Sequence, residues 1–210
     1  MKKLALVIFG CAALLGDAHA ADTVLFEQNF EALPAGPLPK GFLALAGEFS
    51  VIVDGELHYL ELPGAPLDTF GVLFGPSSAE PCTLEGRFWG TKSGRKFPTF
   101  GLSLRGAGGY RLQVSPGKGQ LEIYKGDEPL VGVPFAWQTG TWTSLKLAMR
   151  RQGSGWILEG SASGEGGALP AEPQIRFEVA TDIAAGRAAL WASPYAGTPV
   201  RFDDLRWIAN

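Results

Sequence analysis

The chain has 210 residues, 46% of them hydrophobic, and a net charge of −3 at pH 7. Its length fits one domain with a proper core. The mild acidity argues against nucleic acids and anionic membranes as partners, because both need a concentrated positive face. After residue 20 no apolar segment is long enough to cross a bilayer, so no transmembrane anchor is predicted.

Residues 1–20 have the order of a secretory signal peptide: two lysines near the start, an apolar run over 4–15 and a small-x-small cleavage site at 18–20. We expect the mature protein to begin at Ala21 and to be secreted or periplasmic. A lipoprotein modified at Cys11 is the less favoured alternative, because a bulky phenylalanine precedes this cysteine and the leader is very short.

One domain is predicted over residues 21–210. Cys82 is the single cysteine that remains after cleavage, so no intrachain disulfide can form and the core must supply the stability. We expect Cys82 to be buried and inert, because a reactive thiol needs surroundings that lower its pKa.

Apolar residues alternate with polar ones at period two, and helix signals are nearly absent. This alternation is typical of antiparallel strands that have one buried and one solvated face. It runs over residues 84–89, 100–105, 110–114, 121–124, 143–149 and 174–179.

Glycine-rich segments separate these strands, as tight hairpins require. A first strand is expected over 24–30, followed by a proline-rich surface loop over 33–39. Strands about ten residues apart indicate an all-β sandwich or barrel. The turns lie at 106–109, 116–119, 125–127, 153–155 and 164–167.

The order of these segments resembles the concanavalin A-like lectin/glucanase superfamily, particularly secreted LamG-like jelly rolls. The resemblance covers almost the whole mature chain and is carried by segments 25–30, 47–57, 109–125, 140–147 and 200–205. It implies a two-sheet antiparallel β-sandwich of jelly-roll type. The superfamily includes glycoside hydrolases, carbohydrate-binding modules and protein-binding modules, so the fold alone leaves the activity open.

Catalytic signatures are missing from the sequence. The retaining glucanases of this superfamily carry a Glu-x-Asp-x-x-Glu strand that supplies a nucleophile and an acid/base, whereas Glu80 and Glu85 stand alone here. His58 is the single mature histidine, no Gly-x-Ser-x-Gly elbow accompanies it, and we expect it to be a satisfied strand residue. A glycan hydrolase or lyase with an unrecognised site is kept as an alternative.

A structural calcium ion is the one cofactor that the resemblance implies. In similar jelly rolls an acid of the C-terminal strand joins groups of the N-terminal strands around the ion. Asp203 is the best match, with Glu27 or Glu48 as its partner. Carboxylates and backbone carbonyls are the oxygen ligands that calcium prefers.

Strand alternation places Asp203 on the same face as Leu205 and Trp207, which is the expected buried side. A buried carboxylate must be paired or bound to a metal. The alternative to calcium is therefore a salt bridge to Arg201 or Arg187, or hydrogen bonds from backbone amides.

Polar and aromatic residues on the central strands form the candidate ligand face. Aromatic rings stack on sugars, arginines and amides bind hydroxyls or carboxylates, and three arginines together favour an acidic glycan. An ordinary solvated face is the alternative. The candidates are Arg87, Trp89, Ser103, Arg105, Arg111, Gln113 and Tyr124.

Four tryptophans in apolar runs are assigned to the core instead of the ligand face: Trp142, Trp156, Trp191 and Trp207. The function that these observations favour is an exported, non-catalytic binding module for a carbohydrate or acidic glycan. An envelope domain that binds another exported protein is a further alternative.

Overall fold

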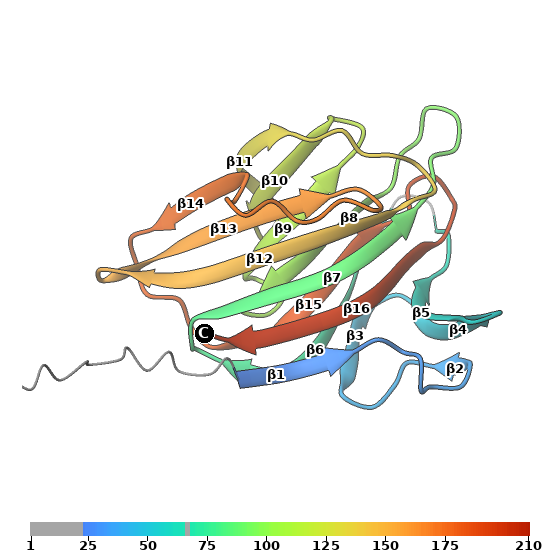
Figure 1. Ribbon diagram of the computed structural model, residues 1–210, viewed down its shortest axis with the longest axis horizontal. Helices are drawn as coiled ribbons and strands as arrows, with labels where there is room; N and C mark the ends of the chain where they lie inside the picture. Colours follow the sequence, from blue (N-terminus) through green and yellow to red (C-terminus); the bar gives the residue numbers. More distant parts are fainter. Residues whose placement is uncertain (1–22, 66–67) are drawn as a thin grey trace, which may run out of the picture.

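A computed structural model describes residues 23–65 and 68–210, which form β-strands and turns without a helix (Figure 1). The predicted all-β class is confirmed. The predicted signal peptide and the start at Ala21 lie outside the described residues. Within these two ranges no helix is long and apolar enough to span a membrane.

The strands form two antiparallel sheets, and the nine-stranded sheet is the nearer one in Figure 1. It consists of β1 (Thr23–Gln28), β2 (Gly36–Pro37), β4 (Ser50–Asp54), β5 (Leu57–Leu62), β7 (Cys82–Gly90), β12 (Trp142–Gln152), β13 (Gly155–Ser163), β14 (Ile175–Val179) and β16 (Val200–Ala209).

The seven-stranded sheet lies behind it. It consists of β3 (Phe42–Ala46), β6 (Phe70–Ser78), β8 (Thr99–Leu104), β9 (Tyr110–Ser115), β10 (Gln120–Lys125), β11 (Glu128–Pro134) and β15 (Gly186–Ser193). Its spatial order is β11-β10-β9-β8-β15-β6-β3, so β8, β9 and β15 form its middle. The two-sheet sandwich predicted from the sequence is thereby confirmed.

The C-terminal strand β16 holds the nine-stranded sheet together. One of its edges pairs with β7, while its other edge pairs first with β5 and then with β1. The register against β7 shifts between Asp203 and Arg206, which marks a β-bulge. Asp204 sits in this bulge with a φ of 48°.

The core lies between the inner faces of the two sheets. Phe88 of β7 stacks on Phe100 of β8 with ring centroids 5.4 Å apart, and Phe202 of β16 meets Phe88 edge-on at 5.5 Å. Burial of each such ring contributes roughly 1.5–3 kcal/mol. Trp156 and Trp207 are buried in this core, as the sequence predicts.

Each predicted strand is present, because both its alternation and its flanking glycines are local signals. Residues 33–39 contain the two-residue strand β2, which pairs with β4, so the predicted surface loop is partly tied into a sheet. Cys82 is free and buried, and burial raises the pKa of its thiol. The Nδ1–H of His58 donates to the Leu33 carbonyl (3.0 Å), which satisfies the ring as predicted.

Candidate functional site

Four of the predicted ligand residues share the outer face of the seven-stranded sheet: Ser103, Arg111, Gln113 and Tyr124. Their strands β8, β9 and β10 are neighbours, and the register sets Tyr124 beside Arg111 and Arg111 beside Ser103. The inner faces of the same strands carry core residues such as Leu112. Alternation therefore brings these four side chains together on the opposite side.

The expectation that Arg87 and Trp89 belong to the same face is wrong. Both lie on β7 and face outward from the nine-stranded sheet. The chain crosses from one sheet to the other between β7 and β8, so these consecutive strands are not neighbours in one sheet. The two residues lie on the opposite outer face of the sandwich.

The side chain of Arg105 does not lie on the expected face either. It follows β8 with a φ of 74°, which turns its side chain away from the sheet. Its Nη1 donates to the Ser78 carbonyl and its Nη2 to the Glu80 carbonyl (2.7 Å), and its guanidinium lies 5.0 Å from the centre of the Trp156 ring. These contacts fasten one end of the sandwich, so Arg105 is a structural residue.

Arg111 lies between two aromatic rings on the seven-stranded sheet. Its guanidinium carbon is 5.0 Å from the centre of the Tyr124 ring and 5.5 Å from the centre of the Trp191 ring. We call these three residues the Arg111 stack. Arginine over an aromatic ring is attracted by the ring quadrupole, by about 0.5–2 kcal/mol.

The sequence-based assignment of Trp191 to the core is wrong. Leu190 and Ala192 point into the core, so Trp191 between them points outward. Its indole lies against Gly71 of β6, where a Cβ would stand 2.6 Å from Cζ3 of the ring. Gly71 thus leaves the space that the ring fills. Residues 188–192 are apolar throughout, so the sequence has no local alternation that could have placed Trp191 on the outer face.

Arg111 is only 8% exposed although it faces away from the core. Its Nε is enclosed without a hydrogen-bond partner, and no carboxylate among the described residues forms an ion pair with it. Burial lowers the pKa of Arg111, whereas the charges of Asp127 and Tyr124 raise it by a smaller amount. Arg111 is therefore a buried cation that the described part of the chain does not neutralise.

Glu122 beside the stack, in contrast, has a hydrogen-bond partner for each of its carboxylate oxygens. It accepts hydrogen bonds from Lys118 Nζ (2.9 Å) and from the Tyr124 hydroxyl (3.0 Å). Burial opposes the charge of Glu122, but hydrogen bonds from Ser115, Lys118 and Tyr124 outweigh it and hold the pKa below its usual value. Sequence analysis missed both Glu122 and Lys118, which alternation and the Pro116–Gly119 turn place at this face.

The nine-stranded sheet carries a second set of stacks. Arg201 lies 4.5 Å from the centre of the Tyr59 ring and 4.4 Å from the centre of the Trp89 ring, and we call these three residues the Arg201 stack. Next to it Arg87 lies 4.8 Å from the Trp142 ring centre. Trp142 belongs to this outer face and not to the core, which corrects its sequence-based assignment.

Both arginines of these two stacks, Arg201 and Arg87, have carboxylate partners. Arg201 Nε lies 3.1 Å from Glu61 Oε2. Arg87 Nη2 lies 2.9 Å from Asp203 Oδ2, and Arg87 Nε lies 3.0 Å from Asp204 Oδ2. The charges of the face are therefore compensated within the protein.

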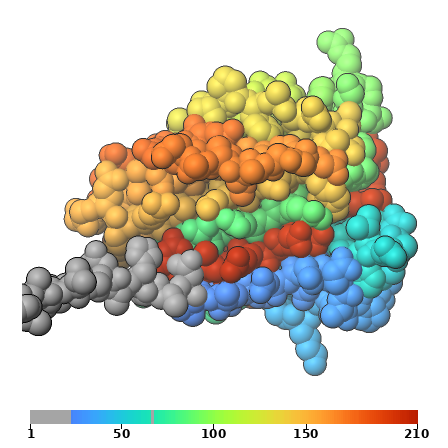
Figure 2. Space-filling model, in the orientation of Figure 1, coloured from blue at the N-terminus to red at the C-terminus, as the bar shows by residue number. Residues whose placement is uncertain are grey.

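A loop covers part of the same face. The segment between β13 and β14 lies across β12 and β13, where Pro170 and Pro173 close one side of a small pocket. Figure 2 shows this segment as an orange ridge above the green β7 and the red β16.

Asp203 does not share a face with Leu205 and Trp207. The bulge at Asp204 interrupts the alternation, so Asp203 points outward to Arg87 while Leu205 and Trp207 point into the core. The pKa of Asp203 is raised to about 6, chiefly by burial and further by the neighbouring charge of Asp204. A backbone hydrogen bond from Asp204 and the charge of Arg87 act in the opposite direction. A salt bridge and a backbone amide hydrogen bond hold Asp203, as the alternative to calcium expected, but Arg201 and Arg187 are wrong as its partners: Arg201 pairs with Glu61, and Arg187 donates to backbone carbonyls.

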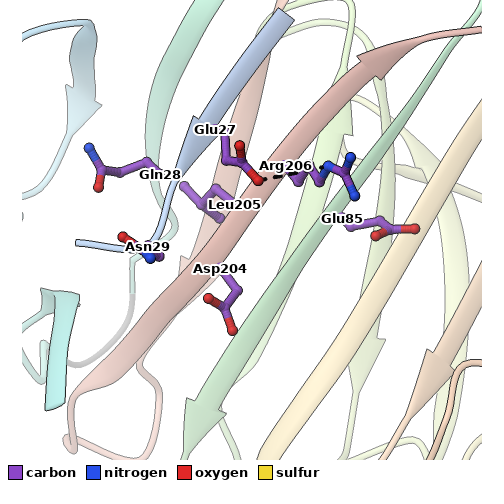
Figure 3. A pocket seen from close by; sticks show the side chains of 7 residues that line it. All are labelled: Glu27, Gln28, Asn29, Glu85, Asp204, Leu205 and Arg206. Carbon is purple, nitrogen blue, oxygen red and sulfur yellow. Dashed lines mark ion pairs between the residues drawn. The ribbon is translucent and has the colours of Figure 1, made fainter. Parts of the chain in front are cut away.

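Glu27 faces an open pocket of about 500 Å³ on the outer face of β1, β16 and β7 (Figure 3). Its carboxylate lies 3.8 Å from Arg206 Nε, and Asp204 stands at the other end of the pocket. Asp203 is not among the lining residues. Within residues 23–65 and 68–210, no three His, Cys, Asp or Glu side chains lie close enough together to hold a metal ion. Calcium stays a prediction.

No protein-family model and no curated protein matches the chain. Solved structures with a similar fold do exist. Carbohydrate-binding module CBM66 from Bacillus subtilis superposes with a TM-score of 0.57 at 14% identity, over 83% of this chain and 99% of that chain. Lectin I-B4 from Griffonia simplicifolia superposes with a TM-score of 0.58 at 10% identity, over 91% of this chain and 100% of that chain.

A xylan β-1,4-xylosidase from Bacillus halodurans is also similar, with a TM-score of 0.56 at 16% identity. The match covers 86% of this chain but 38% of the xylosidase, so this chain corresponds to a part of that enzyme. At these identities the comparisons establish the fold. The chain has the concanavalin A-like jelly-roll sandwich that the sequence resemblance implied.

Proposed function

We propose that this protein is a non-catalytic carbohydrate-binding module whose ligand lies on the outer face of the seven-stranded sheet. The observation that carries the proposal is the Arg111 stack: a half-buried Trp191 and an arginine without an ion-pair partner among the described residues stand together in the middle of the sheet. Indole rings stack on the apolar faces of sugars, and a few convergent polar groups then fix the orientation. Gln113 is half-buried on the same face; its Nε2 donates to Ser115 Oγ (3.0 Å), and its amide oxygen is left to accept a hydrogen bond from a ligand.

The fold comparisons support the same class of function. Two of the structures with this fold are a carbohydrate-binding module and a lectin. The architecture of this chain is thus one that other proteins use to bind carbohydrate.

Acid–base catalysis is the less favoured function for this face. A carboxylate and a tyrosine do meet, since the Tyr124 hydroxyl lies 3.0 Å from Glu122. Both oxygens of Glu122, however, accept hydrogen bonds from the protein. A general acid or base must reach the substrate within hydrogen-bond distance. The pair therefore favours a role in holding the face rigid.

The test is a glycan array followed by calorimetry with the mature protein. We expect saturable binding of at least one saccharide and a loss of about tenfold or more in affinity for Trp191→Ala, because about 1.4 kcal/mol of stacking is a factor of ten. Trp142→Ala is the matched control: it removes a tryptophan stacked with an arginine from the opposite face and should leave the affinity unchanged.

Two results would count against the proposal. If Trp142→Ala abolished binding and Trp191→Ala did not, the ligand would lie on the nine-stranded sheet. If no saccharide bound, an exported protein would become the favoured partner. Repeating the array with EDTA tests the predicted calcium ion, whose removal should weaken binding or stability.

We extend the proposal to export, because residues 1–20 have the order of a signal peptide. Expression of the full chain in a bacterial host should yield a soluble product whose N-terminal sequence starts at Ala21. A product that retains Met1 and stays with the cytoplasmic fraction would contradict export.

A further inference from the structure

Arg111 differs from the other enclosed arginine of the molecule. Arg105 is similarly buried, but its Nη atoms donate to two backbone carbonyls. Arg111 donates no hydrogen bond to any described residue, and its Nε, like that of Arg105, is enclosed without a partner. A buried charge without partners costs several kcal/mol, so proteins rarely retain one without a use for it.

The neighbouring acids do not relieve this cost. Glu122 is occupied by Lys118 and Tyr124. Asp127 acts on Arg111 through its charge but makes no ion pair with it. The guanidinium is held in place by the Tyr124 and Trp191 rings instead. Its position is thus fixed while its hydrogen-bonding capacity is free.

We infer that the ligand of this face is an acidic saccharide, and that the carboxylate of a uronic acid residue accepts hydrogen bonds from the Nη atoms of Arg111. This inference depends on the proposed function, which it makes more specific. It does not need the three clustered arginines expected from the sequence, because the structure distributes Arg87, Arg105 and Arg111 over three separate places.

The chemistry of the Arg111 stack favours a carboxylate over other anions. The guanidinium fork matches the two oxygens of a carboxylate. A tetrahedral sulfate does not match the planar guanidinium in the same way. The sugar ring attached to the carboxylate would then reach the indole of Trp191, and its hydroxyls would reach the Gln113 amide.

The experiment compares polymers that differ in charge alone. The mature protein is titrated with polygalacturonate, alginate and a glucuronate polymer, and with each polymer after chemical reduction of its carboxylates to alcohols. We expect at least one uronate polymer to bind, and the reduced form of the same polymer to bind at least tenfold more weakly. Dextran sulfate serves as the sulfated probe and should bind less tightly than the uronate.

Arg111→Gln should reduce the affinity for the uronate polymer to that of its reduced form. Arg206→Gln is the matched control, because it removes the same charge from an exposed position on the other sheet and should leave the affinity unchanged. Circular dichroism and urea unfolding establish that both variants are folded. Arg111→Lys, which keeps the charge without the fork, should retain a part of the affinity.

Failure of the inference and failure of the proposed function give different results. If the reduced polymer or a neutral glycan binds as tightly as the uronate, and Trp191→Ala abolishes that binding, the function stands and the acidic ligand is wrong. If dextran sulfate bound more tightly than the uronate polymer, and Arg111→Gln abolished that binding, the carboxylate would be the wrong ligand group. If no charged or neutral saccharide binds, both proposals are wrong.

Discussion

The two outer faces of the sandwich carry the same kind of side-chain stack with different charge compensation. On the nine-stranded sheet, Tyr59, Arg201 and Trp89 form a stack in which Arg201 pairs with Glu61. On the seven-stranded sheet, the Arg111 stack has no such carboxylate among the described residues. A contact between arginine and aromatic rings is therefore not by itself a sign of a binding site.

This difference between the two stacks indicates which face needs a ligand. The Arg201 stack is complete, because the aromatic rings position the guanidinium and a carboxylate of the same sheet neutralises it. The Arg111 stack has the positioning rings without the neutralising group. What separates a structural cluster from a candidate site is whether each charged or polar group has a partner within the protein, more than which types of residue are present.

The largest expected effect is a difference in stability between two matched variants. Arg201→Met should lower the free energy of unfolding by about 2 kcal/mol, because it leaves Glu61 without its partner. Arg111→Met should leave the free energy unchanged or raise it by about 1 kcal/mol, since relief of the buried charge offsets the lost stacking. Both variants lose two aromatic contacts, so the difference of about 2 to 3 kcal/mol reports the charge compensation.

Urea unfolding without ligand, followed by far-UV circular dichroism at pH 7, measures both variants. Equal losses of stability would mean that the two arginines are equally compensated, and the contrast between the faces would disappear. A large loss for Arg111→Met alone would make the Arg111 stack a structural element of the sheet.

The strands themselves could be predicted from the sequence because their signals are local. Phe100, Leu102 and Leu104 alternate with polar or small residues, and glycine turns follow. The division of strands between two sheets could not be predicted in the same way. β7 and β8 show the same alternation, yet they lie in different sheets, because period two reports that a strand has a buried face and not which strand it pairs with.

Two features of the candidate site needed the structure for related reasons. The bulge at Asp204 reverses the faces of the residues after it, so simple alternation places Asp203 on the wrong side. Trp191 lies in an apolar run, and the space that it fills exists because Gly71 lies in a strand far away in the sequence. Neither the bulge nor this long-range contact is encoded in the local pattern.

An intermediate effect is expected for Gly71→Ala, which acts on the Arg111 stack without removing any of its members. The new Cβ would stand 2.6 Å from the Trp191 ring and force the indole away from the sheet. We expect the free energy of unfolding to fall by about 2 kcal/mol, within the usual range for overpacking. Saccharide affinity should fall to a similar level as in Trp191→Ala.

Gly36→Ala is the control for Gly71→Ala. Gly36 also lies in a strand, but nothing stands within 4 Å of the position that its Cβ would take. A change in tryptophan fluorescence should accompany Gly71→Ala and not Gly36→Ala. If the two variants behaved alike, Trp191 would not be held by its contact with β6, and a pre-positioned ring would be the wrong description of this face.

The smallest effect concerns the pH dependence of the nine-stranded face. The pKa of Asp203 is about 6 in the folded protein, above the usual 3.8, chiefly because of burial. The folded state therefore holds this proton more tightly than the unfolded state does. The stabilisation from this proton is full below about pH 4 and is lost as the pH rises through about 6. A shift of this size, which already includes the opposing charge of Arg87, corresponds to at most about 3 kcal/mol, of which roughly 1 to 2 kcal/mol is lost between pH 4.5 and 7.5.

Asp203→Asn removes this titration, and Asp204→Asn removes the neighbouring, half-exposed acid that also pairs with Arg87. Free energies of unfolding measured between pH 4.5 and 7.5 should show the wild type losing roughly 1 to 2 kcal/mol relative to Asp203→Asn as the pH rises. A wild type that gains stability over the same range would mean that Arg87 outweighs burial at Asp203. The charges of the nine-stranded face would then be compensated more fully than the burial of Asp203 implies. This face would differ even more from the Arg111 stack.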